Sequence, residues 1–201
     1  MTDRKTLVDQ LAGWAAKRPD RQAIATKVDG AWKTHTWSEY WTAVRETAKG
    51  LIALGHEVGD CVAIVGDNRS EWVICQFGIM AARGVPAPIY TTNTDEQTAY
   101  IVSHSRAKIA ICDGEAQLAK YLTCLERGLM KVDEIITMDS LEPKDERVRS
   151  LEALRALGRE QSDDELEKRL AELTEDETAL LIYTSGTTGV PKAVTLEHGG
   201  M

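Results

Sequence analysis

Hydrophobic and polar positions near the start of the chain follow the periods of a helix and then of a hairpin. Apolar residues from Leu7 to Trp14 recur at helical spacing, and this helix should end before Pro19 because the residue preceding a proline avoids helical geometry. Residues 22–26 and 31–37 flank Asp29-Gly30, a dipeptide that suits the positive φ angles of a tight turn. The pattern therefore predicts a helix followed by a β-hairpin.

A second helix is expected directly after the hairpin. Thr36 is followed three residues later by Glu39, which is the pattern of a capping box, and Gly55 is a suitable end. The residues predicted to share the apolar face of this helix are Tyr40, Val44, Thr47, Ala48 and Leu51.

From residue 61 onward, unbroken apolar runs alternate with helical patterns. Such runs are typical of strands buried on both faces of a sheet, and their alternation with helices predicts βαβ units and a largely parallel sheet. Prolines at 86 and 88 place the second of these strands at an edge of the sheet, or the prolines at a strand end, because proline cannot donate to the ladder. The expected strands are 61–65, 85–90, 108–112, 132–138 and 179–183, and the expected helices are 72–82, 94–104 and 115–126.

The segment 141–177 has a different composition, with dense charge of both signs. Its leucines keep helical spacing in two groups, which predicts two amphipathic surface helices. An acidic interaction segment is the alternative interpretation.

Composition and charge narrow the class of protein. The chain of 201 residues contains 43% hydrophobic and 28% charged residues, which favours a globular domain over a disordered chain. A net charge of −8 argues against a nucleic-acid-binding surface. The N-terminal residues lack the pattern of a secretory signal, and no apolar run approaches the length of a membrane span. Four widely spaced cysteines, without a Cys-x-x-Cys pair, fit a reducing environment, so a cytoplasmic location is expected.

The strongest chemical signal is a glycine-rich run after the last expected strand. Residues 183–192 read Tyr-Thr-Ser-Gly-Thr-Thr-Gly-Val-Pro-Lys. Glycines allow backbone N–H groups to approach an anion, hydroxyls add donors, and Lys192 supplies a mobile positive charge. The run therefore predicts a polyphosphate site, against the alternative of an ordinary polar loop. It is not a Walker A loop, because Pro191 stands where that pattern requires glycine.

This run, followed by His198, closely resembles the signature loop of the acyl-adenylate-forming superfamily, which includes acyl-CoA synthetases, firefly luciferases and the adenylation domains of peptide synthetases. Ala193 departs from the pattern, which commonly has glycine there. Further upstream, the runs 36–39, 59–64, 68–72 and 88–97 resemble long-chain fatty acyl-CoA synthetases. We expect His198 to position the loop, and no metal role for the isolated histidines 35, 56 and 104.

The resemblance implies an α/β fold whose largely parallel sheet is flanked by helices, with residues 1–201 forming the N-terminal part of the large adenylating domain. It implies that a fatty-acid carboxylate attacks ATP to give acyl-AMP and pyrophosphate, and that coenzyme A then displaces AMP. Mg²⁺ is expected to assist, with Thr184 as a possible contact, and Lys192 has a supporting catalytic role. The residues expected to bind the ATP phosphates are Thr184, Ser185, Gly186, Thr187, Thr188, Gly189 and Lys192.

The same resemblance places the remaining large domain and a C-terminal domain beyond residue 201, so the chain by itself is expected to be inactive. We expect residues 184–201 to be mobile or ordered by a neighbouring copy, a homodimer being one such arrangement, and peripheral membrane contact of the longer protein is a further expectation. Two alternatives stay open: a non-catalytic nucleotide-binding or interaction module, and an adenylating ligase for another carboxylic acid.

Overall fold

The structure is a computed structural model that describes residues 6–143, 145–185 and 191–201. Its centre is a parallel sheet of five strands in the order β4-β3-β5-β6-β7. The strands are the apolar runs expected from the sequence, and nearly all residues of the middle strands are buried. The proline-containing strand β4 lies at the edge, as predicted. The bounds are β3 Cys61–Val65, β4 Val85–Ile89, β5 Ile109–Cys112, β6 Glu134–Thr137 and β7 Val148–Ser150.

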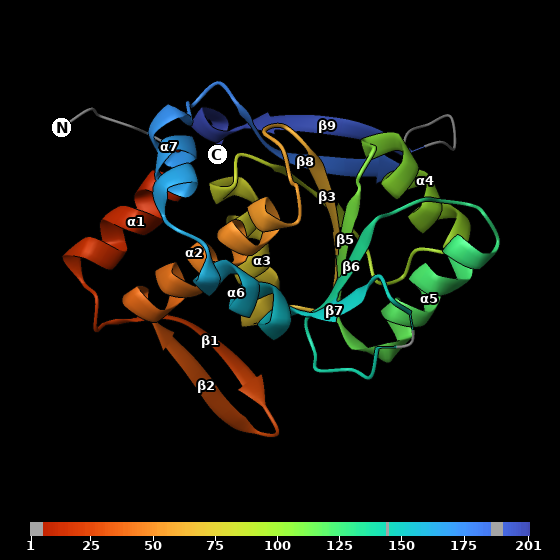
Figure 1. The fold of residues 1–201 in the computed structure, drawn as a ribbon, viewed down its shortest axis with the longest axis horizontal. Coiled ribbons are helices and arrows are strands. Elements are labelled where there is room, and N and C mark those ends of the chain that lie inside the picture. The colour runs from red at the N-terminus through yellow and green to blue at the C-terminus, as the bar shows by residue number, and fades with distance from the viewer. Residues whose placement is uncertain (1–5, 144, 186–190) are drawn as a thin grey trace.

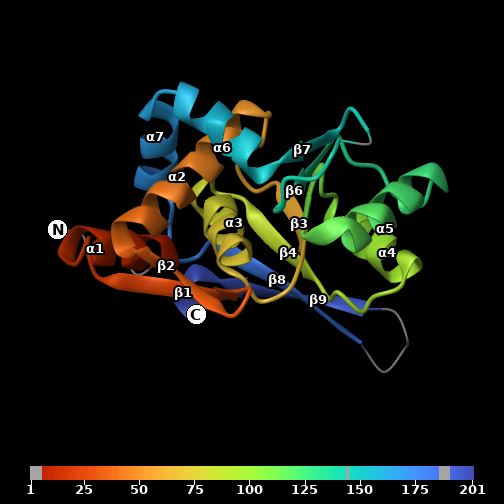
Figure 2. The same ribbon diagram turned by 90° about the horizontal axis from the view of Figure 1, so that it is seen from below.

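Helices cover both faces of this sheet (Figures 1 and 2). Helices α2, α3 and α6 lie on one face and α4 and α5 on the other, which gives the predicted α/β architecture. Two clusters of buried apolar side chains fill the space between the sheet and the helices on its two faces. The helix bounds are α2 Trp37–Ala53, α3 Ser70–Ala81, α4 Asp95–Ser105, α5 Gly114–Glu126 and α6 Leu151–Glu160.

The N-terminal elements pack beside α2. Helix α1 spans Leu7–Lys17, and the hairpin of β1 Gln22–Val28 and β2 Ala31–Thr36 projects from the body (Figure 1). Its turn has φ angles of 49° at Asp29 and 83° at Gly30, as the dipeptide predicted. The capping boxes at the start of α2 and of α4 are both formed, and the predicted apolar face of α2 is buried.

A separate antiparallel hairpin completes the fold. Strand β8, Thr178–Ser185, pairs with β9, Pro191–Glu197, and β8 packs beside β4 (Figures 1 and 2). A short 3₁₀ turn, His198–Gly200, follows. The expectation of mobility for residues 184–201 is therefore wrong for Pro191–Glu197, because backbone pairing with β8 and packing against the body order this strand. That expectation also covered residues 186–190, which lie outside the described part of the chain.

The highly charged segment forms the two predicted helices, α6 and α7, the latter spanning Asp164–Glu172. Strand β7 was not predicted, because its three residues lie among charged neighbours. Its backbone pairs with β6, and Arg149 adds a two-pronged ion pair with Glu134 on β6, with N–O distances of 2.8 Å. Helix α3 begins differently from α2 and α4, with Arg69 at its N-cap position. No side chain caps that helix, and the Ser70 N–H donates to Thr26 Oγ1 instead.

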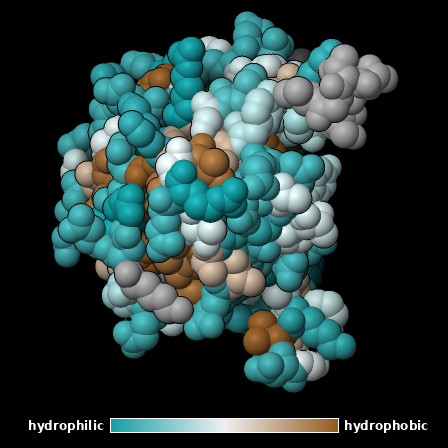
Figure 3. Space-filling model, turned by 90° about the vertical axis from the view of Figure 1, so that its right-hand side faces the viewer, coloured by the Kyte–Doolittle hydropathy of each residue, from teal (hydrophilic) through white to brown (hydrophobic). Residues whose placement is uncertain are grey.

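Most of the surface seen from one side of the molecule is polar (Figure 3). The face of the molecule at the α4–α5 end is mostly hydrophilic, with small separate apolar areas (Figure 3). Among the helices that the structure describes, none is both long and apolar enough to cross a membrane.

Candidate functional site

The β8–β9 hairpin brings together the two ends of the predicted phosphate-binding run. Thr184 and Lys192 are direct partners across the hairpin, and Ser185 is opposite Pro191. Side chains of directly opposite residues in an antiparallel pair point to the same face, with Cβ atoms about 5 Å apart. The Thr184 hydroxyl and the Lys192 ammonium therefore share one face, and both residues are exposed. A donor and a positive charge side by side can bind an anionic group.

The other residues predicted for this site cannot be placed in the same way. Gly186, Thr187, Thr188 and Gly189 lie outside the described residues, and only the backbone of Ser185 is placed. Their assignment to phosphate binding stays a prediction.

A cavity of about 430 Å³ lies beside the hairpin. It is bounded by the segments that follow the carboxyl ends of β3 and β4, by α3 and by β8. In open α/β sheets, ligands bind outside the carboxyl ends of the strands. The residues that line it are Gly66, Asp67, Asn68, Trp72, Pro88, Ile89, Tyr90, Thr91, Leu180, Ile182 and Tyr183.

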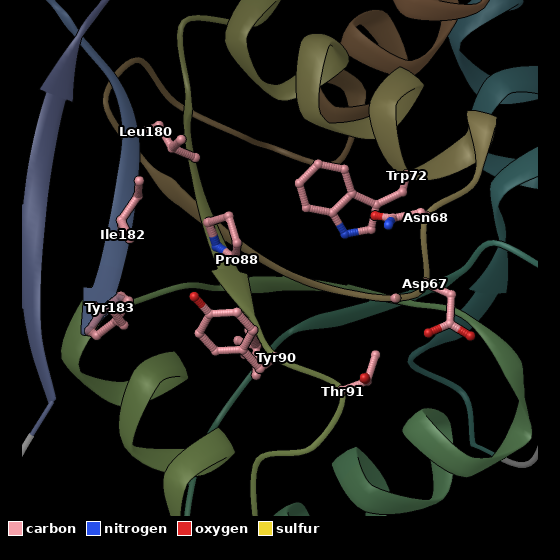
Figure 4. Close-up of a pocket in the computed structure, with 11 residues that line it drawn as sticks. Asp67, Asn68, Trp72, Pro88, Tyr90, Thr91, Leu180, Ile182 and Tyr183 are labelled. Carbon is pink, nitrogen blue, oxygen red and sulfur yellow. The ribbon is translucent and has the colours of Figure 1, made fainter. Parts of the chain in front are cut away.

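The two ends of this cavity differ in chemistry. Figure 4 shows Leu180 and Ile182 on one side and the polar side chains of Asp67, Asn68 and Thr91 on the other, with the Trp72 ring between them. The cavity can therefore hold a molecule that has both apolar and polar parts.

The strand geometry connects the cavity with the exposed pair. Side chains alternate along a strand, so Thr184 lies on the same face of β8 as Leu180 and Ile182, which line the cavity. Lys192 shares that face because it pairs with Thr184. The apolar wall and the phosphate-binding candidates thus form one continuous surface.

The polar side of the cavity is held by hydrogen bonds from neighbouring loops and from α5. The Asp67 N–H donates to Asp113 Oδ2 over 2.6 Å, immediately after β3. After β4, the Lys120 ammonium donates to the carbonyls of Thr91 and Asn93 over 3.2 and 2.6 Å. These contacts fix both segments independently of any ligand.

His198 does not lie where the sequence interpretation required. It begins the turn after β9, six residues from Lys192, so about 20 Å of strand separates the two residues. Its ring is buried, and burial lowers its pKa. The backbone N–H of His198 donates to the Glu177 carbonyl over 3.0 Å. His198 therefore fixes the opposite end of the hairpin and does not position the loop.

The described residues do not form a magnesium site by themselves. Mg²⁺ in nucleotide sites is usually held by one or two carboxylates together with phosphate oxygens. Nowhere in ranges 6–143, 145–185 and 191–201 do three His, Cys, Asp or Glu residues come together so that they could hold a metal ion. Thr184 alone is one neutral donor, so it does not by itself fit a metal centre.

Trp72 and Tyr90 line the cavity, and neither was identified as a site residue from the sequence. Trp72 was expected only as the first residue of the helix 72–82. Tyr90 ends the expected strand 85–90 and directly follows β4. Its side chain is 66% exposed, and no sequence pattern indicates this exposure.

Comparison with known proteins shows which family shares these features. The model of a family described as AMP-binding enzyme matches residues 11–201. The human long-chain-fatty-acid–CoA ligase ACSBG2 is 35% identical over 176 residues, which cover 88% of this chain and 26% of that protein. The chain thus spans about a quarter of the length of this curated relative.

Solved structures share the fold. The fatty acyl-adenylate ligase from L. pneumophila, in complex with acyl adenylate and pyrophosphate, superposes with a TM-score of 0.73 at 19% identity, covering 98% of this chain and 31% of that one. The anthranilate CoA ligase AuaEII, in complex with anthranoyl-AMP, gives a TM-score of 0.75 at 21% identity, covering 98% of this chain and 36% of that one. Similarity at this level of identity establishes the fold.

Proposed function

Because this chain belongs to the AMP-binding enzyme family, we propose that it supplies the phosphate-binding wall of an AMP-forming long-chain fatty acid–CoA ligase. The observation that carries the proposal is the direct pairing of Thr184 with Lys192 at the two ends of the signature run. The similarity to a long-chain-fatty-acid–CoA ligase over 88% of the chain supports the choice of substrate.

In the proposed reaction a fatty-acid carboxylate oxygen attacks the α-phosphorus of ATP, the bond to the β-phosphate oxygen breaks, and acyl-AMP and pyrophosphate form. The thiol sulfur of coenzyme A then attacks the acyl carbon, the thiol proton passes to solvent water, and AMP leaves with the electrons of the broken carbon–oxygen bond. Negative charge on the phosphate oxygens is stabilised by fixed donors and positive charges close to them. Lys192 supplies such a charge and Thr184 a neighbouring hydroxyl donor.

The described residues offer these phosphate-binding groups, and assistance by Mg²⁺ stays a prediction. Since the chain spans a quarter of its curated relative, we assign the complete reaction to the full-length gene product. The cytoplasmic location, the homodimer and the membrane contact stay predictions.

A second candidate retains the reaction type and changes the acid. One structural neighbour is an anthranilate CoA ligase, and its fold is as similar as that of the fatty acyl-adenylate ligase. The cavity supports the fatty acid, because Leu180 and Ile182 give it an apolar wall.

The test is ATP–pyrophosphate exchange with the 201-residue chain and, in parallel, with the full-length gene product. We expect exchange from the full-length product that depends on long-chain fatty acid and exceeds that with medium-chain or aromatic acids. Faster exchange with an aromatic acid than with a long-chain fatty acid would favour the second candidate, a ligase for another carboxylic acid. No exchange with any acid, combined with tight ATP binding, would replace the enzyme with a nucleotide-binding module.

A further inference from the structure

Helix α4 contacts both strands of the β8–β9 hairpin close to the predicted phosphate-binding residues. Tyr100 and His104 lie one turn apart on α4 and face β8 and β9. The Tyr100 hydroxyl donates to the carbonyl of Pro191 over 3.0 Å. His104 Nδ1 is 3.0 Å from the hydroxyl of Tyr183. One helix therefore contacts β8 near its last residue and β9 at its first residue.

Ring contacts add to these hydrogen bonds. The Tyr100 and His104 rings are stacked, with centroids 5.4 Å apart and an angle of 29° between the planes. The His104 and Tyr183 rings meet edge to face at 5.7 Å and 84°. The three rings thus restrict one another's orientation.

The hydroxyl of Tyr183 is suited to this contact. Burial raises the pKa of Tyr183 to about 12, so the hydroxyl stays protonated at neutral pH. It can then donate to His104 Nδ1, 3.0 Å away, in the ring tautomer whose proton is on Nε2.

The positions held by α4 decide where the candidate phosphate ligands lie. Tyr183 immediately precedes Thr184, and Pro191 immediately precedes Lys192. A shift of either strand along the hairpin would change the spacing between the Thr184 hydroxyl and the Lys192 ammonium. The contacts from α4 oppose that shift on both strands at once.

Helix α4 is itself fixed by other contacts, so Tyr100 and His104 are not needed to keep it in place. Its start is closed by the capping box at Thr94. Its inner face is buried, and Arg127 pairs with Asp95 and Glu96. Tyr100 is half-buried at the margin of the apolar core, where replacement by phenylalanine keeps its ring, and His104 is exposed.

We propose that Tyr100 and His104 are positioning residues for ATP binding, which hold Tyr183 and Pro191 so that Thr184 and Lys192 meet the β- and γ-phosphates in a fixed register. This inference rests on the proposed function, since it specifies how the same phosphate site is kept in shape.

The test uses three variants and one control variant of the full-length gene product. ATP–pyrophosphate exchange and thermal unfolding are measured for each. Tyr100→Phe removes one hydroxyl and keeps the ring. His104→Phe keeps a ring without Nδ1, and His104→Asn restores a polar group near the position of Nδ1. Ser103→Ala is the matched control, because Ser103 lies on the same helix and its hydroxyl donates to Leu129 at a distance of 3.5 Å, away from the hairpin.

We expect Tyr100→Phe and His104→Phe each to raise KM for ATP and for pyrophosphate about five-fold, the effect of one lost hydrogen bond. KM for the fatty acid should stay within about two-fold, which is below one such bond. His104→Asn should recover most of the affinity for ATP, and Ser103→Ala should behave as the wild type.

Three results would overturn the inference. Unchanged KM for ATP in both phenylalanine variants would show that α4 does not position the phosphate ligands. Equal increases in KM for ATP and for the fatty acid, with a lowered Tm, would indicate general destabilisation instead. Failure of His104→Asn to recover affinity would exclude the hydrogen bond as the cause. Wild-type protein without any exchange would instead refute the proposed function, and this inference with it.

Discussion

Gly158 on α6 lies directly against the backbone of α2: a Cβ atom at this position would be 2.0 Å from the carbonyl oxygen of Glu46. The approach is mutual, since a Cβ at Gly50 on α2 would be 2.3 Å from the carbonyl oxygen of Leu154 on α6. In both cases the nearest atom belongs to the backbone of the other helix and not to a flexible side chain. The two helices pack at this distance only because both positions lack a side chain.

Replacing Gly158 with alanine should therefore destabilise the protein despite the higher helix propensity of alanine. We expect the free energy of unfolding to fall by at least about 2 kcal/mol, since overpacking against backbone forces the helices apart. Urea denaturation measures it. Gly13→Ala is the matched control, because Gly13 lies inside α1 with no atom within 4 Å of the added Cβ. That variant should gain about 0.5–1 kcal/mol. A loss of the same size in both variants would contradict the argument.

His56 should make the protein sensitive to acid. Its side chain is buried, and its Nε2 finds no hydrogen-bond partner among the described residues. Burial lowers the pKa of His56 from 6.5 to about 4, against the attraction of Asp60, and the positive charges of Arg169 and Lys108 lower it further. The neutral ring is thus favoured in the folded state.

The sign of the pH dependence follows from this. The unfolded chain takes up a proton near pH 6.5, whereas the folded chain resists protonation until about pH 4. The stability associated with His56 is therefore complete above pH 6.5 and is lost as the pH falls toward 4, where the loss levels off at about 3 kcal/mol. Urea denaturation between pH 7 and pH 4 tests this. His56→Gln should show a shallower loss over this interval, and an unchanged slope would disprove the assignment.

Arg169 should contribute more to stability than other arginines in the charged segment. Its side chain is only 10% exposed, and its Nη1 donates to the carbonyls of His56 and Ala82 at 3.0 Å each. Arg169→Ala leaves two buried carbonyls unpaired, so we expect a loss of about 2–4 kcal/mol. Arg159→Ala removes an arginine that is 44% exposed and ion-paired at the surface, and it should cost less than about 1 kcal/mol. Thermal and urea unfolding of both variants decide the comparison.

Loss of the Lys192 side chain should raise KM for ATP and leave KM for the fatty acid nearly unchanged. Lys192→Ala removes a charge-assisted contact to phosphate, and we expect KM for ATP to rise about ten-fold or more in the full-length gene product. KM for the acid should change little. Lys131→Ala, an exposed lysine in the loop before β6, is the control for loss of charge. A smaller effect of Lys192→Ala than of this control would remove Lys192 from the site.

Local sequence patterns were sufficient for most elements, because their causes are local. The turn at Asp29-Gly30, the capping box at Thr36 and the edge position of the strand with Pro86 and Pro88 were predicted and are confirmed. Each depends on a residue's own conformational preference or on partners within three residues. Strand β7 was missed because the ion pair that stabilises it joins Arg149 to Glu134, fifteen residues away.

The sequence by itself determined the α/β class and the resemblance to acyl-adenylate-forming enzymes, and it predicted the phosphate-binding run. Only the tertiary structure decided that Thr184 faces Lys192, that His198 lies at the far end of the hairpin, and that Tyr100 and His104 hold both strands. Periodicity and motif spacing describe neighbours along the chain. The site depends on contacts between residues 79 and 91 positions apart, which exist only after the hairpin has packed beside the sheet.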